Sequence, residues 1–301
     1  MNSLQETYRE EYKEYLMTLF SDAWKKRPMD FIYSILRVTG IHDGHWDPYV
    51  EMLEAFEDYN KILYFSNEQG GKTPLRVGLL MYCQAIEITA VHELLANLLR
   101  GCGDKPFIIN PFIELQRKSK KSAFSYIPPS ANAKIKRLKV LATECGDTKF
   151  IEILDSFYDD QVRNSFVHSD YCITEEEFRW TEGGLQSPKS IEYISNLITR
   201  TFAFFEALIQ VWNTWLFHFT KLPKYTKLPQ YEVLEVHTND KGLFGFSVHF
   251  SNGQRTYFER HPYSINSCNL FLEKDGSINF FVGDLSELER VWKVNGKEID
   301  F

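Results

Sequence analysis

The segment PLRVGLLMYCQAIEITAVHELLANLLRG (residues 74–101) is the most apolar helix candidate in this chain of 301 residues. Proline at its start and glycine at its end suit the first turn and the C-terminus of an α-helix. Arg76, Glu87 and Glu93 interrupt the apolar residues, and no run of 18 apolar residues occurs, which favours a buried helix of a soluble protein over a membrane span. We therefore predict one helix from Leu75 to Arg100.

Helical patterns continue on both sides of this segment. Residues 1–70 alternate apolar and charged side chains at helical spacing and predict an N-terminal helical region. Three further helices are predicted downstream, at 131–145 (closed by Gly146), at 148–171 and at 188–219. The proline-containing loop 102–130 is longer than most helix connections, and long loops of this kind are often functional.

The composition changes after residue 220. Residues 221–230, KLPKYTKLPQ, are typical of a linker. Short alternating runs then follow, separated by Asn239–Gly242 and by the pairs Asn252-Gly253, Asp275-Gly276 and Asn295-Gly296, which indicate β-hairpins. The predicted fold is mainly α: an N-terminal helical region (1–70), a helical bundle (71–220) and a small antiparallel β-domain (231–301).

The net charge of −7 means that any polyanion must meet a local basic surface. Residues 117–139 contain eight basic residues and no acidic one. This segment is either a solvated surface or a phosphate-contacting patch. The candidate RNA-binding residues within it are Lys118, Lys120, Lys121, Lys134, Lys136 and Arg137.

The sequence provides no pattern for a metal, a cofactor or a secretion signal. The five cysteines are scattered without a Cys-x-x-Cys pair, which argues against a disulfide framework and a cysteine zinc site. The segment 42–47, HDGHWD, carries metal-capable side chains, but we interpret it as an ordinary turn because no distant partner ligands are evident. The acidic, amphipathic start is unlike a signal peptide, so we expect a cytoplasmic protein with no membrane partner.

The segment DSFYDDQVRNSFVHSDY (155–171) is the most informative for function. A buried helical stripe is predicted for Ile151, Leu154, Tyr158, Val162 and Phe166. At about 100° per residue, Asn164 and His168 fall together on the opposite side, with Arg163 on the flank. Three chemically capable side chains are thus expected to face solvent, a substrate or a second subunit.

The hexapeptide Arg163-Asn164-Ser165-Phe166-Val167-His168 resembles the Arg-polar-x-x-x-His signature of HEPN domains, and the resemblance covers about residues 75–220. It implies a HEPN-like helical bundle and a metal-independent endoribonuclease of the toxin or phage-defence type. Arg163, Asn164 and His168 would be catalytic, without a cofactor. The resemblance also implies a homodimer in which two such helices form one cleft. An antitoxin or another regulator would be a further partner.

The residue types suit RNA cleavage. A histidine whose pKa is near neutrality can take the proton from the 2′-OH or give one to the departing 5′-oxygen. An arginine can hold the phosphate and oppose the negative charge that develops on it. Asn164 can orient either group, and Glu87 and Tyr171 are supporting candidates, Glu87 because it could pair with Arg163.

Other readings of the same residues stay open. Arg163 lies four residues after Asp159, a spacing that allows an ordinary ion pair on one helix. His168 can be a surface histidine, Glu87 a helix-surface residue, and Tyr171 a packing residue. The alternative function is a non-catalytic HEPN scaffold that binds RNA, a nucleotide or a protein, and the motif can also be coincidental.

Overall fold

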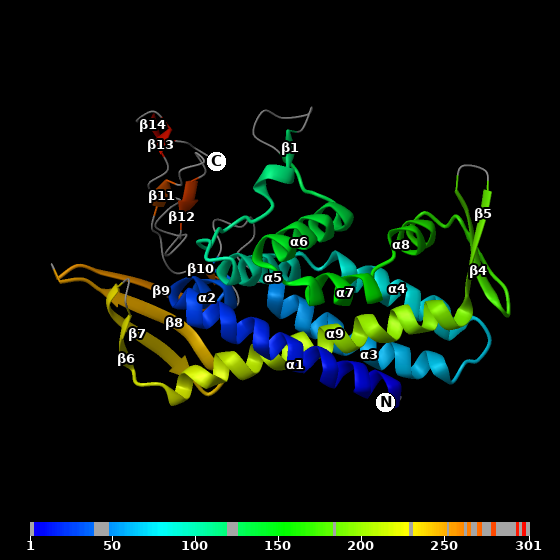
Figure 1. The fold of residues 1–301 in the computed structure, drawn as a ribbon, viewed down its shortest axis with the longest axis horizontal. Helices are drawn as coiled ribbons and strands as arrows, with labels where there is room; N and C mark the ends of the chain where they lie inside the picture. Colours follow the sequence, from blue (N-terminus) through cyan, green and yellow to red (C-terminus); the bar gives the residue numbers. More distant parts are fainter. Residues whose placement is uncertain are drawn as a thin grey trace.

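The computed structural model describes residues 3–38, 48–118, 126–182, 185–228, 231–251 and 253–261, together with 264–265, 270–272, 278–280, 293–294 and 297–298. The chain is mostly helical, with a small antiparallel sheet region near the C-terminus (Figure 1). The α-helices are α1 (Ser3–Lys26), α2 (Pro28–Ile35), α3 (Pro48–Asn67), α4 (Thr73–Glu87), α5 (Thr89–Cys102), α6 (Ala131–Cys145), α7 (Thr148–Phe157), α8 (Asp160–Val167) and α9 (Ile191–His218). Two 3-10 turns, η1 (Ile113–Leu115) and η2 (Phe219–Lys221), complete this set.

The long helix α9 is the centre of the core. Its 28 residues span about 42 Å, and α1 packs along it (Figure 1). Tyr12 on α1 meets Phe204 on α9 edge to face, with ring centroids 5.9 Å apart. The indole nitrogen of the buried Trp212 donates to the carbonyl oxygen of Ile35 at 2.8 Å, which links α9 to α2. These contacts place the N-terminal helices directly on α9.

The single helix predicted from Leu75 to Arg100 is wrong, because the chain breaks at Ile88. α4 and α5 meet at 49°, and Ile88 has an extended backbone. The β-branched pair Ile88-Thr89 is less favourable inside a helix. The bend lets α4 pack on α8 and α9 while α5 packs on α6. Among the described helices, none is by itself long and apolar enough to cross a membrane, although α4 and α5 together meet that length and composition.

The helix predicted for 131–145 is confirmed as α6, which ends at Gly146 with a φ of 81°. The helix predicted for 148–171 is wrong, since it is divided into α7 and α8 at Tyr158. Asp159 begins α8 by accepting hydrogen bonds from the backbone N–H groups of Gln161 and Val162. The last predicted helix starts at Ile191 rather than Pro188, because the side chain of Ser190 caps it.

Three strands that were not predicted from the sequence follow α8. They are β3 (Tyr171–Ile173), β4 (Glu177–Glu182) and β5 (Leu185–Ser190), paired antiparallel in the order β3-β4-β5. Along β4, Phe178 and Trp180 are buried while Arg179 is exposed. That alternation is the period of a strand, and it was present in the sequence.

The predicted antiparallel strands near the C-terminus are present. A five-stranded sheet has the order β10-β9-β8-β7-β6. The predicted linker 221–230 contributes β6 to it, so it is not only a linker. Its strands are β6 (Tyr225–Leu228), β7 (Tyr231–Asn239), β8 (Gly242–His249), β9 (Arg255–His261) and β10 (Ser264–Ile265). Separate antiparallel pairs are formed by β1 (Arg117–Lys118) with β2 (Tyr126–Ile127), β11 (Leu270–Leu272) with β12 (Ile278–Phe280), and β13 (Lys293–Val294) with β14 (Lys297–Glu298).

The predicted turn at Asn239–Gly242 joins β7 to β8. The other three hairpin signals include Asn252, Asp275, Gly276, Asn295 and Gly296, which lie outside the described residues. β8 packs on the end of α9 (Figure 1). Gly242 has a φ of 114°, and a Cβ there would lie 2.7 Å from the backbone of Leu216 on α9, so this close approach requires glycine.

Candidate functional site

Helix α8 is held at its start by a cluster of tyrosines. The backbone N–H of Asp159 donates to the hydroxyl of Tyr82 at 3.0 Å, and that hydroxyl donates to the Asp159 carbonyl oxygen at 3.2 Å. The hydroxyl of Tyr193 on α9 donates to the Asp159 carboxylate at 2.8 Å. Asp159 is thus fixed by α4 and α9 while it caps α8, and the position of the residues that follow is set from several elements.

Arg163 lies one turn further along α8, and its guanidinium is held on two sides. Nη1 donates to the side-chain oxygen of Asn164 at 2.7 Å, and Nη2 forms an ion pair with Glu87, the last residue of α4. The Arg163 side chain is 18% exposed, and its Nε is buried without a hydrogen-bond partner among the described residues. The Asp159–Arg163 ion pair that the spacing allowed is not formed, because the Asp159 carboxylate caps the helix. Glu87 is therefore the partner that orients Arg163.

A cysteine lies behind Arg163. The thiol of Cys83 donates to the Arg163 carbonyl oxygen with a sulfur–oxygen distance of 3.9 Å. Burial raises the pKa of Cys83 to about 12, although the nearby guanidinium opposes this rise. The neutral thiol is a packing group at neutral pH and does not supply a nucleophile.

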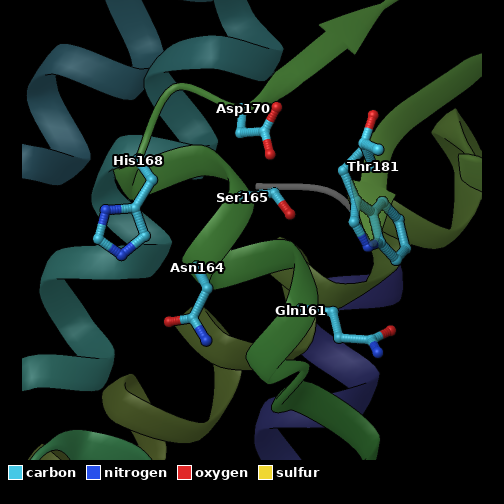
Figure 2. Close-up of a pocket in the computed structure, with 7 residues that line it drawn as sticks. Gln161, Asn164, Ser165, His168, Asp170 and Thr181 are labelled. Carbon is cyan, nitrogen blue, oxygen red and sulfur yellow. The ribbon is translucent and has the colours of Figure 1, made fainter. Parts of the chain in front are cut away.

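His168 is the residue that ends α8, and it is exposed. Its backbone N–H donates to the Asn164 carbonyl oxygen at 2.9 Å, while Ser169 follows with a φ of 58° and turns the chain toward β3. Figure 2 shows the imidazole of His168 and the amide of Asn164 extending to the same side of α8. Asn164 and His168 thus lie on the same side of α8, as predicted, and Arg163 is hydrogen-bonded to Asn164.

A pocket of about 220 Å³ lies beside these residues, between α8 and β4. Figure 2 shows Gln161 and Ser165 on the side of α8 that faces Thr181, with the Asp170 carboxylate nearby. We call this the α8–β4 pocket; its lining residues are Gln161, Asn164, Ser165, His168, Asp170, Trp180 and Thr181. Asn164 and His168 were predicted from the sequence, and the other five lining residues were not. The signals present were the i,i+4 spacing of Gln161 and Ser165, and Asp170 two residues after His168.

Tyr171 lies at the start of β3 and does not line the pocket. Its ring stacks on Phe166 at 5.0 Å and on Phe178 at 5.2 Å between centroids. This placement matches the packing reading of Tyr171. It links α8 to the small β3–β5 sheet.

Two of the six candidate RNA-binding residues do not contribute an unpaired charge to an exposed surface. Lys134 is buried, and its Nζ donates to the Thr89 hydroxyl at 2.7 Å, so its ammonium does not belong to an exposed patch. Arg137 is paired with Glu114 at 2.6 Å, which offsets its charge. Lys136 is exposed on α6. Lys118 lies in the short strand β1, and Lys120 and Lys121 lie outside the described residues.

Within the described residues, no group of three or more His, Cys, Asp or Glu side chains could hold a metal ion. The segment 42–47 lies outside the described residues. Arg163, Asn164 and His168 are not a metal-binding set, since only one of them is a good metal ligand.

Comparison with protein-family models, curated proteins and solved structures finds no match to this chain. The resemblance to HEPN domains therefore depends on the motif itself and on its setting in a mostly helical chain.

Proposed function

We propose that this chain is a metal-independent endoribonuclease with a HEPN-like helical scaffold, in which Arg163, Asn164 and His168 act on one phosphodiester. The observation that carries the proposal is the arrangement at α8: an exposed imidazole, an amide on the same side of the helix, and a guanidinium bonded to that amide. The HEPN-like assignment rests on the sequence motif. The arrangement of the three side chains supports the cleavage chemistry independently of that assignment.

The reaction needs no metal because RNA supplies its own nucleophile. The 2′-oxygen attacks the adjacent phosphorus, its proton passes to a base, and the bond from phosphorus to the 5′-oxygen breaks as that oxygen receives a proton. The products are a 2′,3′-cyclic phosphate and a 5′-hydroxyl. His168 serves as the base or the acid.

Arg163 neutralises the charge that develops on the phosphate oxygens. Two of its nitrogens are committed to Asn164 and Glu87, which fix the plane of the guanidinium. A fixed guanidinium loses less freedom when the phosphate binds, and this favours the transition state. Glu87 is a positioning residue in this scheme and touches no substrate.

A homodimer would supply the second proton-transfer group. Val167 and His168 are both exposed at the end of α8, where a second copy could pack. Two copies of His168 across one cleft would provide both a base and an acid. We place the protein in the toxin or phage-defence class, cytoplasmic, with a regulator that restrains it.

The direct test is cleavage of RNA by purified protein in the presence of EDTA. We expect activity that EDTA does not reduce, and a loss of roughly 100-fold or more in His168→Ala and Arg163→Ala. His218→Ala, an exposed histidine on α9, is the control and should remain active. Cleavage that requires added metal, or that survives both substitutions, contradicts the mechanism.

Binding of RNA without turnover would favour the alternative, a non-catalytic binding module. The ion pair between Glu87 and Arg163 is the observation that gives this alternative weight, because it already neutralises the guanidinium. Expression in a bacterial host separates the two readings. Growth arrest by the wild type, absent with His168→Ala, supports the nuclease.

A further inference from the structure

The α8–β4 pocket contains several polar groups that make no hydrogen bond within the described part of the chain. They are the Asp170 carboxylate and the Thr181 hydroxyl, which are exposed, and the hydroxyl of the half-buried Ser165. The indole nitrogen of Trp180, beneath them, is buried without an acceptor in that same part of the chain. The preceding carboxylates, Asp159 and Asp160, are by contrast fully engaged with neighbouring residues. Polar groups that gather in one pocket and are not engaged by the protein are available to a ligand.

We infer that this pocket binds a guanine base, and that the enzyme cleaves RNA at the phosphate attached to that guanosine. The inference rests on the proposed ribonuclease function and names its substrate. Asn164 and His168 line the same pocket as Asp170 and Trp180, so the base and the reacting phosphate belong to one nucleotide.

Guanine fits because of the Asp170 carboxylate. A carboxylate only accepts hydrogen bonds and is best satisfied by two neighbouring donors. Guanine alone among the four RNA bases presents two adjacent donors, N1–H and the N2 amino group, on one edge. Adenine would place the N1 lone pair against the carboxylate, and uracil would place a carbonyl oxygen there, which leaves the negative charge unpaired.

The remaining pocket groups complement the other edge of the same base. Guanine carries two acceptors, O6 and N7, and the pocket offers donors in the hydroxyls of Ser165 and Thr181. Figure 2 places Asp170, Ser165 and Thr181 around one space, with Gln161 below them. Discrimination is expected to come mainly from Asp170, because a base that leaves a charged acceptor unpaired is strongly disfavoured.

The test measures binding of guanosine 3′-monophosphate and inosine 3′-monophosphate by calorimetry. Inosine lacks only the N2 amino group. We expect the wild type to bind the guanosine nucleotide at least tenfold more tightly, since one hydrogen bond to a charged group is lost with inosine. Asp170→Asn should reduce this ratio to near one, and Asp170→Ala should do the same. Asp240→Asn, in the β7–β8 turn beside the C-terminal end of α9, should retain it.

Equal binding of the two nucleotides by the wild type, or no binding of either at millimolar concentration, overturns the guanine pocket. Cleavage that depends on His168 but shows no preference for guanosine also overturns it while leaving the ribonuclease proposal intact. Conversely, selective binding that depends on Asp170, in a protein that cleaves no RNA, supports the pocket as a guanine site and contradicts the proposed enzyme.

Discussion

At the scale of single residues, the proposed chemistry depends on the contacts that hold Arg163. Its guanidinium lies between Asn164 on its own helix and Glu87 at the end of α4. Residues 87 and 163 are far apart in the sequence, and the packing of α4 on α8 brings them together. The proposed catalytic group therefore depends on a positioning residue outside α8.

Glu87→Gln tests this positioning. The substitution keeps the size of the side chain but removes the charge, which weakens one of the two contacts that orient Arg163. We expect kcat for RNA cleavage to fall about tenfold with KM little changed, because the interaction acts mainly in the transition state. The melting temperature should change little, since Glu87 is 41% exposed.

A change in KM alone would contradict the positioning role, as would full activity. Glu57→Gln on α3 is a suitable control, because that exposed carboxylate lies outside the α8–β4 pocket. Its kinetics should match those of the wild type.

The buried His92 gives a prediction for pH dependence. Burial, together with the smaller effect of the nearby Lys134 charge, lowers the pKa of His92 from 6.5 to about 3. The unfolded chain takes up a proton below about pH 6.5 while the folded chain does not, so stability is present above that pH and is lost as the pH falls toward 3. From pH 7 to pH 5 this amounts to about 2 kcal/mol for the one group.

Unfolding by urea at pH 7 and pH 5 measures this effect. We expect the pH-dependent loss to be smaller by about 2 kcal/mol in His92→Phe than in the wild type. His218→Phe, at an exposed position on α9, should keep the full loss. An unchanged slope in His92→Phe would mean that the imidazole is not held neutral.

At the scale of elements, the helix ends were predictable where local chemistry decides them. Gly146 adopts a positive φ and closes α6 at the predicted residue. The helix break before Thr89 was not predictable in this way, because it depends on which neighbours α4 and α5 contact. The break at Asp159 had a local signal, since aspartate favours the start of a helix, but apolar residues at helical spacing on both sides masked it.

In the candidate site too, residues related by local spacing were predictable and residues brought in by tertiary contacts were not. Arg163, Asn164 and His168 could be grouped from spacing on one helix. Trp180 and Thr181 could not be added, because β4 reaches α8 only through the β3–β5 sheet. Lys134 was placed on the surface because its charge suggested exposure, whereas its hydrogen bond to Thr89 satisfies it in the interior.

Gly242 tests how the C-terminal sheet is attached to α9. Gly242→Ala places a Cβ 2.7 Å from the Leu216 backbone at a φ of 114°, so either β8 or α9 must shift. Gly253→Ala is the matched control, because its φ of 81° is also positive while no atom lies within 4 Å of the added Cβ. We expect the control to lose about 1 kcal/mol of unfolding free energy and Gly242→Ala at least about 1 kcal/mol more. Equal losses in urea unfolding would contradict the close approach.

At the scale of the whole molecule, the proposed cleft requires two chains of 35.4 kDa. Light scattering should give twice that mass at micromolar concentration. Val167→Asp should reduce the mass to that of one chain and abolish cleavage, since it puts a charge at the end of α8 where the second copy is proposed to pack. Val140→Asp on α6 is a control of similar exposure, 46% against 50%, and should stay dimeric and active.

A monomeric wild type that cleaves RNA at full rate would contradict the composite cleft. It would leave His168 as the single proton-transfer histidine of each chain, and a second group from the same chain would then be required.

Attack by the 2′-oxygen is tested with an RNA oligonucleotide that carries a single 2′-deoxy substitution at the cleaved position, incubated with wild-type protein in EDTA. The proposed mechanism predicts that the unmodified strand yields a 2′,3′-cyclic phosphate and a 5′-hydroxyl, and that the substituted strand is not cut at that position. Cleavage of the substituted bond at a similar rate would contradict the mechanism, because the attacking oxygen would then come from water rather than from the RNA.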